Sequence, residues 1–193
     1  MERMLSASNA IDSVLNRVAM TVGWLFVACT IVIAFDVLSR KFGFQMPGMG
    51  STRLQELEWH MHTALFSFWL GIAYVKNAHV RIDIAFINAK PRTQVWAEFW
   101  GCILLAIPYC LLAIFFSFDF TWIAWVDNEG SASSNGLPWR WLPKGFITAG
   151  LLMLLAAVIS VLMRTIVYLF GPEELRSKAS VAVIKHHNDG AVL

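Results

Sequence analysis

The chain has 193 residues, of which 58% are hydrophobic and only 15% are charged. Ordinary soluble domains carry about 25% charged residues, so this composition indicates a membrane protein. The formal net charge of +2 is too small to indicate nucleic acid as a partner, and the basic residues do not form one cluster.

Four stretches of the chain carry no charged residue. Because a charged side chain at mid-bilayer costs about 2.5–3.5 kcal/mol, such stretches are typical of segments that lie in lipid. We expect an all-α integral membrane protein with four transmembrane helices and interfacial amphipathic segments. The charge-free stretches are Val18 to Phe35, Thr63 to Val75, Phe99 to Phe118 and Gly145 to Met163, and the predicted spans are about 18–38, 56–76, 95–126 and 145–170.

Residues 1–17 place apolar residues among charges at partly helical spacing, which predicts a cytoplasmic amphipathic lead-in to the membrane domain of residues 18–170. A signal peptide is the competing interpretation of the first span. The apolar run is longer than the usual 7–15 residues, and Asp36 to Arg40 follows it in place of small residues, so a span is preferred. The four-residue spacing of Asp36 and Arg40 predicts an ion pair.

Glycine and proline residues between 43 and 50 predict a turn, and a second helix is expected to start with Ser51 or Thr52 as its cap. The stretch 51–62 is amphipathic. It either lies in the membrane interface or extends the second span as a tilted helix.

The third span is expected to continue past Asp119 to Val126, with a kink at Pro108. Asp119 needs a partner or water, and packing against another polypeptide is as plausible as a role in transport. Tryptophans at both ends of this region are typical of an aromatic belt. Residues 171–193 are expected to be a cytoplasmic tail.

The sidedness of the chain follows from its Lys and Arg residues. With four spans, both termini and the middle loop share one side, which holds ten of these residues, whereas the other side holds five. The positive-inside rule therefore predicts that both termini are cytoplasmic.

Few side chains in the sequence are candidates for catalysis or for binding a metal or cofactor. Cys29, Cys102 and Cys110 all fall in apolar spans and are expected to pack there, while His60 and His62 point to different faces of a helix. We therefore expect no metal, no cofactor and no enzymatic activity. The chain is expected to be an accessory subunit; a membrane anchor of a redox enzyme and an independent small exporter or channel remain alternatives.

Three segments in order resemble the small permease subunit (Q subunit) of tripartite ATP-independent periplasmic (TRAP) transporters. They are Leu54-Gln-Glu-Leu-Glu-Trp-His60, Phe68-Trp-Leu-Gly-Ile-Ala-Tyr74 and Ala78-His-Val-Arg-Ile-Asp83. The segment from Gly136 to Lys144 is similar to the corresponding segment in the branch of this family that is associated with mannitol or chloroaromatic compounds. The resemblance covers most of residues 15–170.

The resemblance implies a bacterial inner-membrane assembly of three parts. A periplasmic substrate-binding protein captures an organic acid, and a large permease subunit carries it inward with a sodium gradient. The small subunit is expected to bind the large one and to widen its immobile scaffold, with membrane lipids as a further partner. Sodium coupling and substrate recognition are expected in the other subunits, so no catalytic or substrate-binding residue is assigned here.

Two groups of residues are candidate contacts. Residues that match the family pattern are expected to fix helix ends, the inner loop, lipid headgroups or the large subunit: Glu56, Glu58, His79, Arg81 and Asp83. Charged residues on the predicted periplasmic side are candidates for docking the binding protein: Arg40, Lys41, Arg53, Asp127, Glu129, Arg140 and Lys144.

Overall fold

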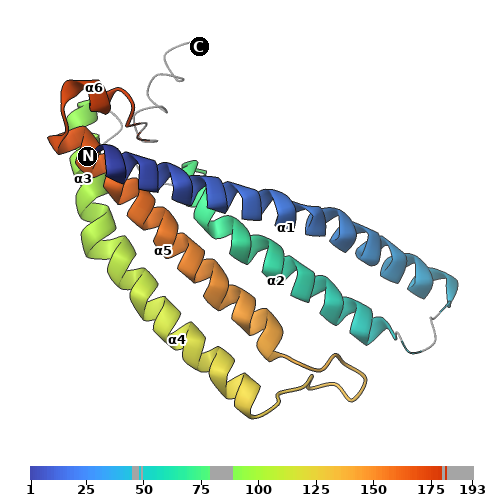
Figure 1. Cartoon of the computed structure of the whole chain (residues 1–193). Helices are drawn as coiled ribbons and strands as arrows, with labels where there is room; N and C mark the ends of the chain where they lie inside the picture. The colour runs from blue at the N-terminus through green and yellow to red at the C-terminus, as the bar shows by residue number, and fades with distance from the viewer. Residues whose placement is uncertain (45–47, 49, 79–88, 180, 182–193) are drawn as a thin grey trace. The chain divides into compact units, whose positions relative to one another are not determined.

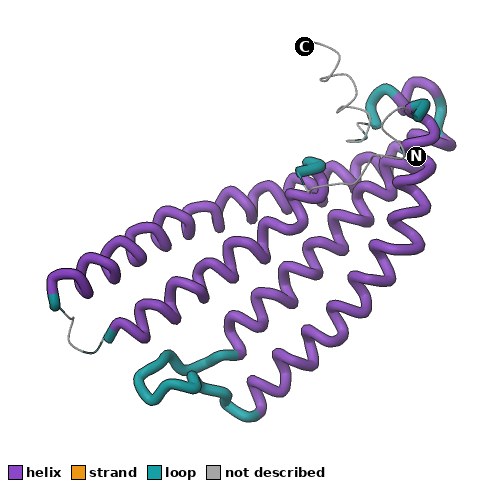
Figure 2. Tube along the Cα trace, turned by 180° about the vertical axis from the view of Figure 1, so that it is seen from behind, coloured by secondary structure: helices purple, strands orange, loops and turns teal. Residues whose placement is uncertain are grey.

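The computed structural model describes residues 1–44, 48, 50–78, 89–179 and 181. Within these ranges every regular element is a helix, which confirms the all-α fold class (Figures 1 and 2). The elements are α1 (Glu2–Phe42), α2 (Ser51–Val75), α3 (Pro91–Gly101), the π-helix η1 (Cys102–Ala106), α4 (Ile107–Val126), α5 (Trp141–Phe170) and α6 (Glu173–Arg176).

Among the described residues, three helical segments are long and apolar enough to cross a membrane: Glu2–Phe42, Pro91–Val126 and Trp141–Phe170. Helix α2 is not among them, because its first half carries Arg53, Glu56, Glu58 and two histidines. It nevertheless runs unbroken from Ser51 to Val75, so residues 51–62 belong to the same helix as the apolar stretch after them. The fourth crossing stays a prediction.

Three of the long helices end at a residue whose backbone adopts the left-handed conformation. Gly43 follows α1, Asn77 follows α2 and Asn128 follows α4, with φ angles of 68°, 54° and 47°. After each of them the next amide donates to a carbonyl five residues earlier, as in Phe44 N to Ser39 O at 2.9 Å. This Schellman arrangement satisfies carbonyls that the helix end would leave unpaired.

The chain divides into two compact units. The first unit contains Met1–Arg17, Leu70–Leu112 and Leu152–Leu193, and the second contains Val18–Trp69 and Ala113–Leu151. Helices α1, α2, α4 and α5 each contribute a segment to both units.

Glycines let α2 and α5 approach at backbone distance. In the second unit, a Cβ atom built on Gly150 would lie 2.4 Å from the backbone oxygen of Ser67. In the first unit, a Cβ on Gly71 would lie 2.8 Å from the backbone oxygen of Met153. Small residues allow such contacts between membrane helices, where lipid provides no hydrophobic drive for association.

Polar side chains join α1 to α5 in the first unit. Ser8 and Ser160 are both fully buried, and their hydroxyls lie 2.8 Å apart. Arg164 donates to Ser8 Oγ at 2.7 Å and pairs with the carboxylate of Asp12. The N-terminal segment of α1 is therefore packed on α5 through a satisfied buried network.

Near Pro108, where the sequence predicted a kink, the structure has the π-helix η1, which ends two residues before the proline. Pro108 has no N–H, and its ring would collide with the carbonyl four residues earlier in a regular helix. The wider turn, closed by the Ile107 N–H donating to Cys102 O, accommodates the proline without ending the helix.

The Ser51 hydroxyl is not the predicted helix cap. It donates at 3.0 Å to Asp36 Oδ1 on α1, while Gly50 O accepts from the amides of Arg53 and Leu54. The prediction was wrong because a buried carboxylate on another helix competes for this hydroxyl.

We predict that Gly150→Ala destabilises the protein by about 1–3 kcal/mol, because the added methyl group overlaps the backbone of Ser67. Gly101→Ala is the matched control, since nothing lies within 4 Å of a Cβ at this helical glycine. Thermal unfolding of the purified chain in detergent measures both. Equal melting temperatures for the two variants would contradict the close contact.

Candidate functional site

The loop between α4 and α5 has a fixed internal structure. Its two arms are joined by hydrogen bonds from Ser131 N to Leu137 O at 3.2 Å and from Arg140 N to Glu129 O at 2.9 Å. Both bonds lie within the second unit. The long connection of residues 127–140 is therefore an organised surface feature, as functional loops often are.

Two side chains of α2 hold this loop. The carboxylate of Glu56 accepts hydrogen bonds from Ser131 Oγ and from the Leu137 amide. Arg53 donates to Asn135 O at 3.2 Å and to Gly48 O at 2.7 Å. Because Arg53 and Glu56 are three residues apart on a helix, they project on the same side and engage the loop together.

The surroundings of Glu56 favour its charged form. This residue precedes the apolar stretch of α2. Partial burial alone would raise the pKa of its carboxyl, but the hydrogen bonds from Ser131 and Leu137 and the charge of Arg140 hold that pKa below its ordinary value. The negative charge and the loop contacts therefore stabilise each other.

A second group of charges gathers where the loop joins α5. Glu129 pairs with Lys144, and its carboxylate lies 3.8 Å from Arg140. The Lys144 ammonium sits 3.8 Å from the ring centre of Phe120, and the Arg140 guanidinium sits 5.9 Å from that of Trp59. Four predicted docking residues, Arg53, Glu129, Arg140 and Lys144, are thus brought together in and beside the loop.

Trp139 stands out within the loop. Its backbone has a φ of 65°, a conformation that bulky residues rarely adopt, and 60% of the residue is exposed. An exposed tryptophan near the start of a predicted span is typical of an aromatic belt. A positive φ angle is usually found at glycine or asparagine, so the sequence gives no sign of this backbone conformation at a tryptophan.

Arg40 and Lys41, the remaining basic docking candidates, end α1. Arg40 forms the predicted ion pair with Asp36, at 2.7 Å. Asp36 is fully buried, whereas about half of the Arg40 side chain is exposed, at 49%. Lys41 lies beside the ring of Phe42, 5.9 Å from its centre, and Asp127 is exposed just after α4.

The residues that match the family pattern fall in different places. Glu56 binds the loop, and the backbone oxygen of Glu58 accepts a hydrogen bond from Cys29 Sγ at 3.6 Å. His79, Arg81 and Asp83 lie outside the described residues. Their predicted contacts stay predictions.

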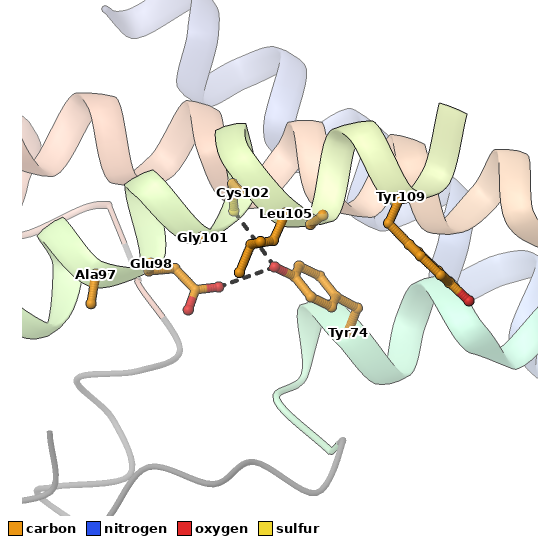
Figure 3. Close-up of a pocket in the computed structure, with 8 residues that line it drawn as sticks. Tyr74, Ala97, Glu98, Gly101, Cys102, Leu105 and Tyr109 are labelled. Atoms are coloured by element: carbon orange, nitrogen blue, oxygen red, sulfur yellow. Dashed lines mark hydrogen bonds between the residues drawn. The ribbon is translucent and has the colours of Figure 1, made fainter. Parts of the chain in front are cut away.

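A cavity of about 490 Å³ opens in the first unit between the end of α2 and the segment α3–η1–α4 (Figure 3). The Tyr74 hydroxyl donates to Glu98 Oε1 at 3.2 Å and lies 3.5 Å from Cys102 Sγ. Leu105 and Tyr109 contribute to its lining. Sequence reasoning missed this site because Tyr74 and Glu98 are 24 positions apart, and the family pattern that contains Tyr74 does not extend to Glu98.

No group of three or more His, Cys, Asp and Glu side chains in the described part of the chain is placed to hold a metal ion. The organised polar features there are helix contacts, one structured loop and a cavity. Together with the three apolar helices, they define an all-α integral membrane protein.

Comparison with known families identifies the chain. Residues 12–167 match the family described as tripartite ATP-independent periplasmic transporters, DctQ component. The match covers most of the chain, which therefore belongs to this family. The resemblance to the small permease subunit is confirmed, while the branch stays a prediction. The family is a component of bacterial inner-membrane transporters and is not an enzyme family. No curated protein and no solved structure matches the chain.

We predict that Glu56→Gln loosens the loop by about 2 kcal/mol, because the neutral amide keeps one acceptor oxygen but loses the charge and the second acceptor. Hydrogen exchange at the Leu137 amide should speed up. In the wild type, the carboxylate's contribution is present above the ordinary Glu pKa of about 4.3 and is lost as the pH falls through the lowered pKa.

The control is Glu173→Gln, which neutralises an exposed carboxylate of α6 in the first unit. Exchange at Leu137 should be unaffected by this change. If both variants leave the loop amides as protected as in the wild type, Glu56 does not hold the loop.

Proposed function

We propose that this chain is the small membrane subunit that scaffolds the large permease subunit of a TRAP transporter. In the same proposal it helps to dock the periplasmic substrate-binding protein for sodium-driven uptake of an organic acid. The match of residues 12–167 to the DctQ component carries the proposal, since it reaches into all the long helices. It favours a transport subunit over a redox-enzyme anchor or an independent exporter.

The helix contacts support the role of a scaffold. Backbone contacts at Gly71 and Gly150 and the buried network around Ser8 and Arg164 hold neighbouring helices together in each unit. A frame around a moving transport domain must resist being dragged along. Tilted helices and interfacial segments increase the area over which such a frame contacts lipid, and so help to anchor it.

The loop of residues 127–140 supports a docking role. The positive-inside bias favours a periplasmic position for this loop, where a secreted binding protein would meet it. A loop already fixed by Glu56 and Arg53 loses little conformational entropy on binding. Arg and Trp, which this loop presents as Arg140 and Trp139, are frequent at energetic centres of interfaces.

The other candidates take supporting parts in the proposal. Arg40, Lys41 and Asp127 would add charge near the docking surface and speed the encounter. Glu56 and Glu58 would position α2 and the loop. His79, Arg81 and Asp83 would contact lipid headgroups or the large subunit on the cytoplasmic side. Sodium and substrate would bind the other subunits.

The decisive experiment compares uptake by the complete reconstituted transporter with uptake by the large subunit and binding protein alone. We expect uptake of the acid to vanish without the small subunit, and the small and large subunits to copurify. Full uptake without it would refute the requirement. A haem absorption band in the purified chain would favour the redox anchor, and solute flux through this chain alone would favour an exporter.

We further predict that Trp139→Ala weakens docking of the binding protein about tenfold, because truncating an exposed aromatic anchor commonly costs more than 1 kcal/mol. Binding of the substrate-loaded binding protein to the transporter in nanodiscs measures the change. Trp100→Ala is the matched control, since Trp100 is similarly exposed, at 50%, but belongs to the first unit. An equal loss in both variants would indicate general membrane anchoring by tryptophan.

A further inference from the structure

Asp119 projects from the outer side of α4. In the second unit, the inner side of this helix is marked by Ser117 and Thr121, whose hydroxyls lie 2.8 and 3.1 Å from Thr148 Oγ1 on α5. Asp119 is two residues from each of them. Two residues correspond to about 200° around a helix, so its carboxylate points away from α5.

The side chains that share this outer side are large and apolar. Phe115, Trp122, Ile123 and Val126 are each more than half exposed, at 68%, 56%, 51% and 61%. Asp119 is exposed too, and it makes no hydrogen bond or ion pair with the described part of the chain. One carboxylate therefore interrupts an apolar strip of a helix that is long enough to cross the membrane.

The neighbouring helix shows how deep this carboxylate lies. Because Thr148 contacts both Ser117 and Thr121, it marks the level of Asp119 on α5. The charge-free stretch of α5 begins at Gly145, three residues earlier. At a rise of about 1.5 Å per residue, Asp119 lies about 4.5 Å inside the apolar layer that α5 defines.

A carboxylate at this level needs a partner or water, and a cationic side chain is the partner that would neutralise its charge. An aspartate has one methylene group, so it cannot reach the headgroups as long lysine and arginine side chains do. Ionisable groups within membrane segments usually pair with another polar group. An arginine or lysine on a second membrane helix would supply the opposite charge, and the apolar strip would pack against the rest of that helix.

We infer that the outer side of α4, centred on Asp119, binds a transmembrane helix of the large permease subunit that carries a basic residue at the same depth. This inference rests on the proposed function, because it names the contact by which the small subunit would hold its partner. Charge complementarity at Asp119 selects this occupant over lipid, which offers no cation within the hydrocarbon layer.

The first experiment measures the affinity between the small and large subunits in nanodiscs. We expect Asp119→Asn to lower the affinity about tenfold, Asp119→Lys to lower it further by repulsion, and Asp119→Glu to retain most of it. Glu173→Gln, which neutralises an exposed carboxylate outside the long helices, should leave the affinity unchanged. Circular dichroism of each small-subunit variant alone tests whether it is folded.

The second experiment places a photo-reactive amino acid at position 119 or, as a control, at the inner position 117. We expect position 119 to crosslink to a segment of the large subunit that contains Arg or Lys. Adducts with lipid only, or wild-type affinity in folded Asp119→Asn, would overturn the inference. Failure of even the wild-type subunits to associate would instead refute the proposed function.

Discussion

The close approach of α2 and α5 is the constraint on which the other contacts depend. Lipid is as apolar as the helices themselves, so association must come from tight packing and polar contacts. Gly150 and Gly71 provide the packing, since a side chain at either position would strike the backbone of the other helix. Without room for this contact, α5 would be displaced from α2 in both units.

Polar contacts then hold the neighbouring helices in place around the close contact of α2 and α5. The hydroxyls of Ser117, Thr121 and Thr148 join α4 to α5, and Asp36 and Ser51 join the end of α1 to the start of α2. Each buried polar group is costly unless it is satisfied, so each of these contacts also selects one arrangement of the helices. The outer surfaces of the helices carry many exposed large apolar side chains.

The sequence predicted the all-helical fold class because charge-free stretches and glycine turns are local signals. It also predicted the Asp36–Arg40 ion pair, which a four-residue spacing determines. It could not predict that Ser51 would donate to Asp36, or that Glu56 would hold the loop through Ser131 and Leu137. Those contacts join residues 15 to 81 positions apart, and they depend on how the helices pack.

The π-helix η1 changes the phase of the helix that contains it. Cys102 is buried, and an uninterrupted α-helix would turn position 109 inward two turns later. Tyr109 is instead 65% exposed, and Cys110 is buried. The extra residue of the wide turn delays the inward face by one position, or about 100°. Deleting one residue between 102 and 106 would therefore rotate α3 against α4 and expose on one of them the side that is now buried.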